Sequence, residues 1–269
     1  MTRPQIMGIV NVTPDSYSYC GHWEDVDAAV AHASELFDAG AAIIDIGGES
    51  TRPGADRIDP DDERRRVLPV VRELSDRRIP VSVDTVNAGT AAEAIAAGAV
   101  IINDVSGGLA DPAMAEVIAD SRVHYVVMHW RGGASMEPRH VDVVAEVRAE
   151  LRTRLAELVL AGVQPEQLVI DPGLGFAKST DDNWRLLSRL DELVSLGHGV
   201  LVGASRKRFV GAILEEGAPM TDRDAPTAVI SALAAAKGAW AVRVHDVAST
   251  RVALDVWQAF DSGTAGVAS

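Results

Sequence analysis

The chain has 269 residues, of which 47% are hydrophobic and 24% charged, a composition typical of a globular protein rather than a disordered or fibrous one. Its formal net charge of −14 argues against non-specific attraction to nucleic acid or to an anionic membrane, although a local basic pocket can still bind an anion. The single cysteine, Cys20, excludes an internal disulfide, and no apolar run reaches the roughly 20 residues that span a bilayer. Because the amino terminus has no basic-then-apolar leader, we expect a cytoplasmic protein.

Short runs rich in Val and Ile recur along the chain, each followed by a cluster of Gly, Asn, Asp or Ser and then by a helical pattern. These runs predict eight strands, in chain order near 5–10, 42–46, 80–83, 99–102, 123–128, 167–170, 199–202 and 241–244. Their continuous apolar character is typical of parallel strands that are covered on both faces.

Amphipathic stretches lie between the predicted strands. In chain order their apolar faces are Val26, Val30, Leu36 and Phe37; then Val67, Val70, Val71 and Leu74; then, in the longest predicted helix, 141–162, Val144, Val147, Leu151, Leu155, Leu158 and Val159. We expect Pro69 to kink or restart the second helix and the charged run 60–66 to be a solvated helix face. The Ala-rich segment 228–241 is predicted to be a packed helix that runs into the last strand.

The strict alternation of strands and helices predicts an α/β fold, either a closed barrel or an open doubly wound sheet. Eight strands, together with a chain length typical of that fold, favour a single (β/α)8 TIM barrel. No linker or second composition regime divides the chain, so one domain over 1–269 is expected. The tail after about residue 261 is expected to be frayed or disordered.

Polar residues cluster just after the predicted strands, where the loops of a (β/α)8 barrel build an active site. Strand by strand they are Asn11; Glu49 to Arg52; Asp84 and Thr85; Asn103 and Asp104; His129; Asp171; Ser205 to Lys207; and His245. Any one Asp or Asn among them could instead be a helix cap or a turn residue. Their recurrence after all eight strands favours a shared site.

Seven segments of the chain resemble the dihydropteroate synthases. They are MGIVNVTPDS at 7–16, GGESTRPGA at 47–55, VSVDT at 81–85, INDVSGG at 102–108, DPGLGFAK at 171–178, GASRKRF at 203–209 and VRVHDV at 242–247. A motif such as DPG or SRK is weak alone, whereas this ordered set over nearly the whole chain is specific. The resemblance implies a transferase of folate biosynthesis, which joins 6-hydroxymethyl-7,8-dihydropterin diphosphate to p-aminobenzoate and releases 7,8-dihydropteroate and diphosphate by a dissociative substitution.

Carboxylates and carboxamides suit the edge of a flat heteroaromatic ring with several N–H donors. Asp84, Asn103 and Asp171 supply that set, and the resemblance assigns them to the pterin, with Lys207 on the pterin carbonyl and a ring nitrogen. The alternative interpretation of Asp171 is the start of an Asp-Pro-Gly turn. Negative Asp84 is also expected to stabilise the cationic pterin-methylene species that forms when diphosphate leaves.

Diphosphate requires cations and N–H donors, and usually a metal, because charge develops on its oxygens as the bond breaks. Arg52, Arg243 and His245 are candidates, and Asn11 could give one neutral oxygen to Mg²⁺, with water and diphosphate completing the octahedron. His245 could instead be a buried histidine satisfied by the backbone, but its spacing from Arg243 on a strand points both side chains the same way. The expected catalytic set is Asp84, Lys207, Arg243 and His245.

The resemblance places p-aminobenzoate against Thr51 and Pro53, with Phe176 stacking nearby and the start of the helix after Lys207 receiving the carboxylate. Arg208 stands where many relatives have a serine, and it either replaces a hydroxyl contact by charge or points to solvent. Sulfonamides are expected as competitors. A homodimer is a family expectation, and His129 is expected to pack around the site rather than to catalyse.

The first loop departs from the family pattern, since PDSYSYCG carries Tyr17, Tyr19 and Cys20 where Phe, Asp and Gly are common. Loss of a carboxylate and of a flexible glycine is expected to slow loop closure. This loop alone supports one alternative, a non-catalytic pterin-binding paralogue. A second alternative, a methyltetrahydrofolate methyltransferase domain, would not be expected to keep GGESTRPGA or SRK.

Overall fold

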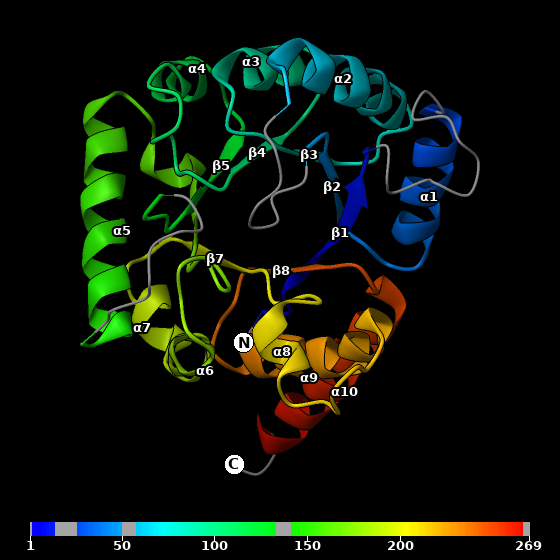
Figure 1. The fold of residues 1–269 in the computed structure, drawn as a ribbon, viewed down its shortest axis with the longest axis vertical. Coiled ribbons are helices and arrows are strands. Elements are labelled where there is room, and N and C mark those ends of the chain that lie inside the picture. The colour runs from blue at the N-terminus through cyan, green and yellow to red at the C-terminus, as the bar shows by residue number, and fades with distance from the viewer. Residues whose placement is uncertain (1, 14–25, 50–57, 133–140, 266–269) are drawn as a thin grey trace.

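A computed structural model describes residues 2–13, 26–49, 58–132 and 141–265. Eight parallel strands form a closed barrel in chain order, and β1 pairs with β8 to close it (Figure 1). The strands are β1 Gln5–Asn11, β2 Ile43–Gly47, β3 Val81–Asp84, β4 Ile101–Asp104, β5 His124–Met128, β6 Leu168–Asp171, β7 Gly199–Val202 and β8 Ala241–Val244. The predicted (β/α)8 TIM barrel is confirmed.

Helices surround the barrel as an outer ring (Figure 1). They are α1 Val26–Asp38, α2 Pro60–Asp76, α3 Ala88–Ala96, α4 Met114–Ala119, α5 Val143–Leu160, α6 Thr180–Ser188, α7 Leu190–Val194, α8 Arg208–Gly211, α9 Asp224–Ala236 and α10 Val247–Ala265, with short 3-10 turns at Pro165–Gln167 and Met220–Arg223. Within the described part of the chain, no helix combines the length and apolarity needed to cross a membrane.

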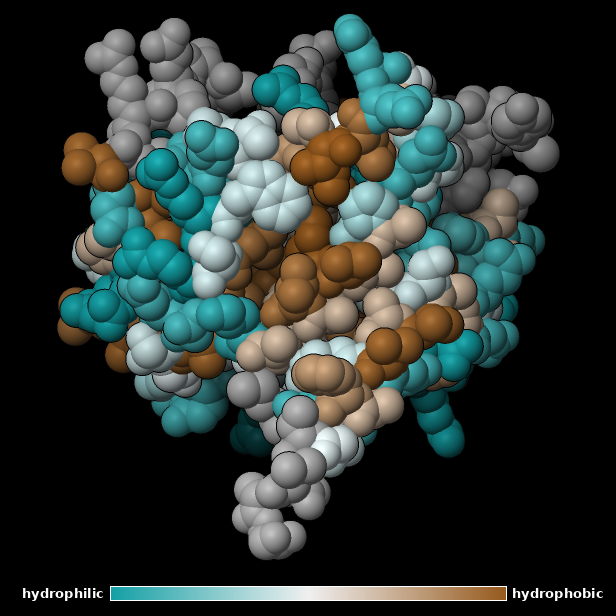
Figure 2. Space-filling model, turned by 90° about the horizontal axis from the view of Figure 1, so that it is seen from below, coloured by the Kyte–Doolittle hydropathy of each residue, from teal (hydrophilic) through white to brown (hydrophobic). Residues whose placement is uncertain are grey.

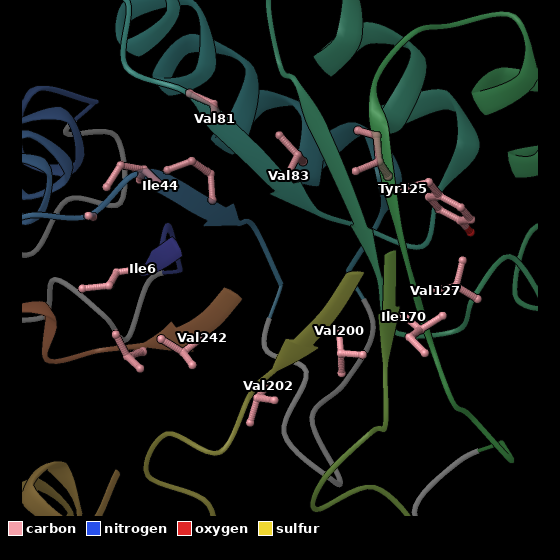
Figure 3. Packing of buried hydrophobic residues seen from close by; sticks show 14 of the residues in the cluster. Ile6, Ile44, Val81, Val83, Tyr125, Val127, Ile170, Val200, Val202 and Val242 are labelled. Carbon is pink, nitrogen blue, oxygen red and sulfur yellow. The ribbon is translucent and has the colours of Figure 1, made fainter. Parts of the chain in front are cut away.

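The apolar core has two layers because side chains alternate along each strand. One set points outward to the helices; its strand members include Ile44, Val83, Tyr125, Val127 and Val242, which Figure 3 shows on the outer side of the strands. The inner set fills the barrel and consists of Met7, Ile43, Ile101, Val126, Val169, Leu201 and Ala241. The inner set therefore identifies which strand positions face the barrel axis.

Several details of the sequence-based expectations were wrong. α2 runs unbroken through Pro69, so the helix does not restart there, and a kink at Pro69 stays a prediction. Glu63, within the charged run 60–66, is buried, because that helix turns one carboxylate toward α3. Val159 and Phe37 are 40% and 37% exposed, and each lies in the last turn of its helix. α10 continues as helix to Ala265, and the rest of the expected tail, 266–269, lies outside the described residues.

Candidate active site

The polar pocket lies one layer above the inner apolar residues, toward the carboxyl ends of the strands. Four inner apolar residues are each followed, two positions later, by a polar or charged residue. The pairs are Ile43 and Asp45, Ile101 and Asn103, Val169 and Asp171, and Ala241 and Arg243. Because the strand period is two, these side chains also face the barrel axis. The parallel register then brings residues from distant parts of the sequence to one mouth.

Arg243 forms the centre of this layer. Its Nε donates to Asp45 Oδ2 at 2.6 Å, and its Nη2 donates to Asp84 Oδ2 at 2.8 Å. Burial disfavours the guanidinium charge, yet the two carboxylates outweigh that effect and hold the pKa of Arg243 above its ordinary value. Burial raises the pKa of Asp84 to about 7, with Arg243 opposing the rise and Asp45 adding to it. Burial thus disfavours the charged form of Asp84, and the ion pair with Arg243 favours it.

Asn103 binds Asp45, the same buried carboxylate that pairs with Arg243. Its Nδ2 donates to Asp45 Oδ2 at 3.2 Å, and both side chains are buried. With the amide nitrogen directed to Asp45, the carboxamide oxygen is the group left to accept a hydrogen bond from a ligand. Asp45 thus orients two predicted site residues, Asn103 and Arg243, at once.

Asp171 ends β6 and serves the turn that follows it. Its Oδ1 accepts from Gly173 N at 2.7 Å, so the interpretation of Asp171 as a turn residue holds for one of its oxygens. Burial raises the pKa of this carboxyl, and Lys207 and the Gly173 hydrogen bond oppose the rise. Burial also disfavours the charged form of Lys207 and lowers its pKa to about 8, while Asp171 opposes that fall. A Cβ built on Gly203 would lie 3.6 Å from Asp171 Oδ2 and 3.9 Å from Lys207 Nζ, so the two groups border the same glycine.

Lys207 is held against the loop between β6 and α6. Its Nζ donates to the carbonyl oxygen of Leu174 and lies 4.7 Å from the centre of the Phe176 ring. The ammonium over an aromatic face is a cation–π contact. The structure thus brings together Lys207, predicted to bind pterin, and Phe176, predicted to stack on p-aminobenzoate.

His245 follows β8 directly and pairs with Ser205, which lies in the loop after β7. Its Nδ1 lies 2.8 Å from Ser205 Oγ, and its backbone N–H donates to the same oxygen at 3.2 Å. The serine hydroxyl donating to Nδ1 would leave the proton of a neutral ring on Nε2. Arg208, the first residue of α8, is exposed, which agrees with the alternative in which it points to solvent.

Residues 7–245 match the family model described as pterin binding enzyme. The dihydropteroate synthase of Mycobacterium leprae (strain TN) is 53% identical to this chain over 260 residues, which cover 94% of this chain and 92% of the relative. The chain belongs to the dihydropteroate synthases, within the pterin-binding enzyme family. The dihydropteroate synthase of Bacillus subtilis (strain 168) is 44% identical, covering 90% of this chain and 83% of the relative.

Solved structures of other dihydropteroate synthases share the fold closely. The enzyme of Xanthomonas albilineans with 4-aminobenzoic acid has a TM-score of 0.91 at 46% identity, covering 96% of this chain and 93% of that one. The same organism's enzyme in complex with 7,8-dihydropteroate has a TM-score of 0.88 at 44% identity, over 97% and 95% of the two chains. The Yersinia pestis enzyme in a sulfonamide drug complex has a TM-score of 0.90 at 38% identity, over 97% and 95%.

Some of the residues that this family resemblance selected lie outside the described part of the chain. They are Thr51, Arg52 and Pro53 of the second loop, and Tyr17, Tyr19 and Cys20 of the first. Asn11 is described at the end of β1, half-buried. A Cβ built on neighbouring Gly47 would lie 3.6 Å from Asn11 Oδ1 and 3.7 Å from Asp84 Cβ, so these two predicted residues flank the same glycine.

Two charged residues near the site, Asp45 and Lys178, were not among the residues predicted from the sequence. Asp45 was not selected, although a charge inside the run IIDIG needs a buried partner. Lys178 belongs to the segment DPGLGFAK, but its residue type alone gave no reason to place it in the site. Asp104, which follows the site residue Asn103, instead shapes the next loop by accepting from Ser106 N at 2.7 Å and from the Tyr125 hydroxyl at 2.7 Å.

Proposed function

We propose that this chain catalyses the dihydropteroate synthase reaction in the polar layer around Arg243. The observation that carries the residue assignment is that Asp84, Asn103, Asp171 and Arg243 occupy inward-facing strand positions at one barrel mouth, with Lys207 beside them. Acceptors from three strands and one lysine suit the edge of a pterin, which offers several N–H donors and one carbonyl. Lys207 would leave the Leu174 carbonyl to reach that ligand.

Asp171 and Asn103 would bind the pterin with the atoms that the protein leaves to them. Asp171 Oδ1 is used by Gly173, so Oδ2 is the oxygen that would accept from the ring. Asn103 would accept through its carboxamide oxygen, because its nitrogen donates to Asp45. Asp84 would stabilise the pterin-methylene cation once diphosphate has left, and the amine of p-aminobenzoate would then attack that carbon.

The leaving diphosphate would meet Arg243, His245 and, from the second loop, Arg52. Arg243 directs Nε and Nη2 to carboxylates, which leaves Nη1 as the guanidinium group for the anion. Among the described residues, no group of three or more His, Cys, Asp or Glu could hold a metal. A single amide oxygen from Asn11 nevertheless fits Mg²⁺, which keeps its waters and binds substrate phosphates. When bound, the ion would neutralise charge developing on the diphosphate.

The p-aminobenzoate slot would lie between Phe176 and the second loop with Thr51 and Pro53. Arg208, exposed at the start of α8, would meet the carboxylate from the solvent side. Relatives of this chain have been solved with 4-aminobenzoic acid and with a sulfonamide drug, and we propose that both classes of molecule compete for this slot.

We also propose that the protein is a homodimer formed through α9 and α10. These helices pack side by side and present a row of exposed apolar side chains, which Figure 2 shows gathered on one face. The row consists of Val229, Leu233, Val252, Val256 and Phe260, each more than half exposed. A contiguous apolar face of this kind is typical of an interaction surface. The cytoplasmic location expected from the sequence stays a prediction.

The direct test combines turnover and ligand binding. Purified protein incubated with dihydropterin-methyl diphosphate, p-aminobenzoate and Mg²⁺ is expected to release dihydropteroate and diphosphate. Asp171→Asn and Lys207→Ala should each lower pterin affinity by roughly 10- to 100-fold, because a charged hydrogen bond to a buried ligand contributes about 1.5–3 kcal/mol. Asp171→Asn keeps an acceptor for Gly173, so the turn is retained.

The matched controls are Asp191→Asn and Lys237→Ala, which alter an exposed ion pair between α7 and the end of α9. Calorimetric titration with a pterin should give parental affinity in both. Unchanged affinity in Asp171→Asn and Lys207→Ala would remove the proposed pocket. Pterin binding without turnover would favour the non-catalytic paralogue.

A further inference from the structure

The loop between β6 and α6 folds around the side chain of its own Lys178. The ammonium Nζ lies 3.0 Å from Gly173 O, 3.1 Å from Phe176 O and 3.0 Å from His129 Nδ1. A lysine ammonium has three N–H donors, so these three acceptors use all of them. Lys178 is therefore bound entirely to protein groups and closes the loop on itself.

The backbone of this loop is one that a free chain would rarely adopt. Gly173, Gly175 and Ala177 all have positive φ, and Ala177 does so at 45° with a side chain present. A Cβ on Gly173 would lie 2.3 Å from the carbonyl oxygen of His129, so the loop packs directly on the end of β5. A strained backbone persists only where its surroundings hold it, and the contacts of Lys178 do so here.

His129 fixes the far side of this lysine. Burial lowers the pKa of His129 to about 3, and neighbouring Lys178 adds to the effect, so the ring is neutral. A neutral ring that accepts from Lys178 at Nδ1 carries its proton on Nε2, which lies 2.9 Å from Glu150 Oε2. Arg131 Nε in turn donates to that Glu150 oxygen at 3.0 Å. The loop is thereby tied to α5.

The same loop carries groups that the proposed function uses. Phe176 lies on it, and its carbonyl is one of the acceptors of Lys178. The Leu174 carbonyl on it holds Lys207. Asn183 of α6 supports the opposite edge by accepting from Gly175 N at 2.6 Å. The position of Phe176 thus depends on Lys178 more directly than that of Asp171, which is fixed within β6.

We propose that Lys178 is a positioning residue for p-aminobenzoate, holding the loop from Gly173 to Phe176 so that the Phe176 ring lines the slot. This inference rests on the proposed function, which supplies the two substrates. Lys178 acts through the loop and touches no reacting atom, because its donors are directed to protein acceptors.

The first test is the kinetic behaviour of Lys178→Met, which keeps the length of the side chain and removes its donors. The KM for p-aminobenzoate should rise about tenfold, while kcat changes less than about threefold and pterin affinity stays within about twofold. The reason is that Asp84, Asn103 and Asp171 lie on strands and Lys207 leaves the Leu174 carbonyl when pterin binds, whereas Phe176 lies on the loop. Lys237→Met, at an exposed lysine, is the matched control and should behave as the parent.

The second test is a pH profile, which a merely structural contact would not change. Charged and titratable groups face Lys178 from every element around it: Asp171 of β6, Glu150 of α5, His129 and Arg131 after β5, and Lys207 after β7. Burial lowers the pKa of Lys178 to about 7, with Asp171 opposing. The parental KM for p-aminobenzoate should therefore rise between pH 6.5 and 8.5 toward that of Lys178→Met, whose own profile is flatter.

Equal KM values and equal pH profiles in parent and Lys178→Met would overturn the proposal. So would a uniform loss of kcat, pterin affinity and thermal stability with no specific effect on p-aminobenzoate. Should Lys178→Met fail to fold, Lys178→Arg keeps the charge throughout this pH range, and its KM should lack the rise. A rise in Lys178→Arg equal to that of the parent would overturn the proposal as well.

An inactive parent would contradict the proposed function, and the role of Lys178 in the loop would then be tested by hydrogen exchange, which needs no turnover. The amide of Phe176 donates to Gly173 O at 3.1 Å, within the loop that Lys178 closes. Its hydrogen exchange should be about tenfold faster in Lys178→Met than in the parent or in Lys237→Met. Unchanged exchange would then reject the role of Lys178.

Discussion

Arg243 shows how a buried charge organises the residues around it. A guanidinium removed from water needs carboxylates nearby, and Asp45 and Asp84 supply them from two neighbouring strands. The sequence predicted Arg243 and Asp84 as separate ligands of diphosphate and pterin. The structure links them in one ion-paired group, so a change at either residue is expected to alter the pocket of the other.

Lys207, the half-buried lysine of the pocket, gives a pH-dependent prediction. Burial lowers the pKa of Lys207 to about 8, below that of a lysine in water, so above pH 8 the unfolded chain binds more protons at this site than the folded chain. The free energy of unfolding must therefore rise with pH in that window. Between pH 7.5 and 9, the parent should gain about 1 kcal/mol more than Lys207→Met.

Urea unfolding at the two pH values measures this difference, and Lys237→Met serves as the control because that lysine is exposed and surface-paired. Lys178 titrates in both parent and Lys207→Met, so its contribution largely cancels in the comparison. Parallel stability profiles for the parent and Lys207→Met would show that Lys207 has an ordinary pKa in the folded protein.

The sequence predicted the strands well because a parallel strand covered on both faces is a continuous apolar run. Each described strand begins and ends within two residues of its expected bounds. The side-chain partners were harder to predict. Asp45 lies two residues after Ile43, which fills the barrel, and that spacing alone would have placed it inward. Its partners, Arg243 and Asn103, come from strands whose pairing only the closed barrel fixes.

Helix α2 also has a side-chain partner that the sequence did not reveal, and this contact gives a stability prediction. Glu63 looked like part of a solvated acidic start, but its Oε2 accepts from Thr90 Oγ1 at 2.6 Å and from Asn87 Nδ2 at 2.8 Å. Truncating it would leave two polar groups of the β3–α3 region without their acceptor. Glu63→Ala should lower the free energy of unfolding by about 1–3 kcal/mol.

The control for this prediction is Asp62→Ala in the same helical turn, where the carboxylate is exposed and pairs with Arg65. A surface ion pair of this kind contributes about 0–1 kcal/mol, so the loss should be small. Urea denaturation of the two variants beside the parent makes the comparison. Similar losses would mean that burial of Glu63 is not important for docking α2 on α3.

At the scale of the whole molecule, the barrel separates stability from recognition. The lower interior is filled by apolar side chains, and the polar layer lies above it at the carboxyl ends of the strands. Loops predicted to complete the site, with Thr51, Arg52 and Pro53, lie outside the described residues. This separation lets the outer surface of the helices serve another purpose, because no predicted substrate contact uses α9 or α10.

The exposed row on α9 and α10 leads to a prediction about assembly. In a two-fold symmetric dimer the same face meets itself, so each substitution is introduced twice into one interface. Leu233→Glu combined with Val256→Glu would bury four carboxylates without partners, a cost that an interface of ordinary size cannot offset. Light scattering coupled to size exclusion should give two chains for the parent and one for this double variant.

The control is Leu160→Glu, which places the same charge at an 88% exposed leucine at the end of α5, on a different side of the barrel (Figure 1). It should remain dimeric. Pterin affinity of the double variant should stay within about twofold of the parent, because the substituted residues lie on the outer helical layer and the pterin ligands lie inside the barrel. A parent that is monomeric at micromolar concentration would reject the dimer. A parent and double variant that are both dimeric would instead place the interface on another face.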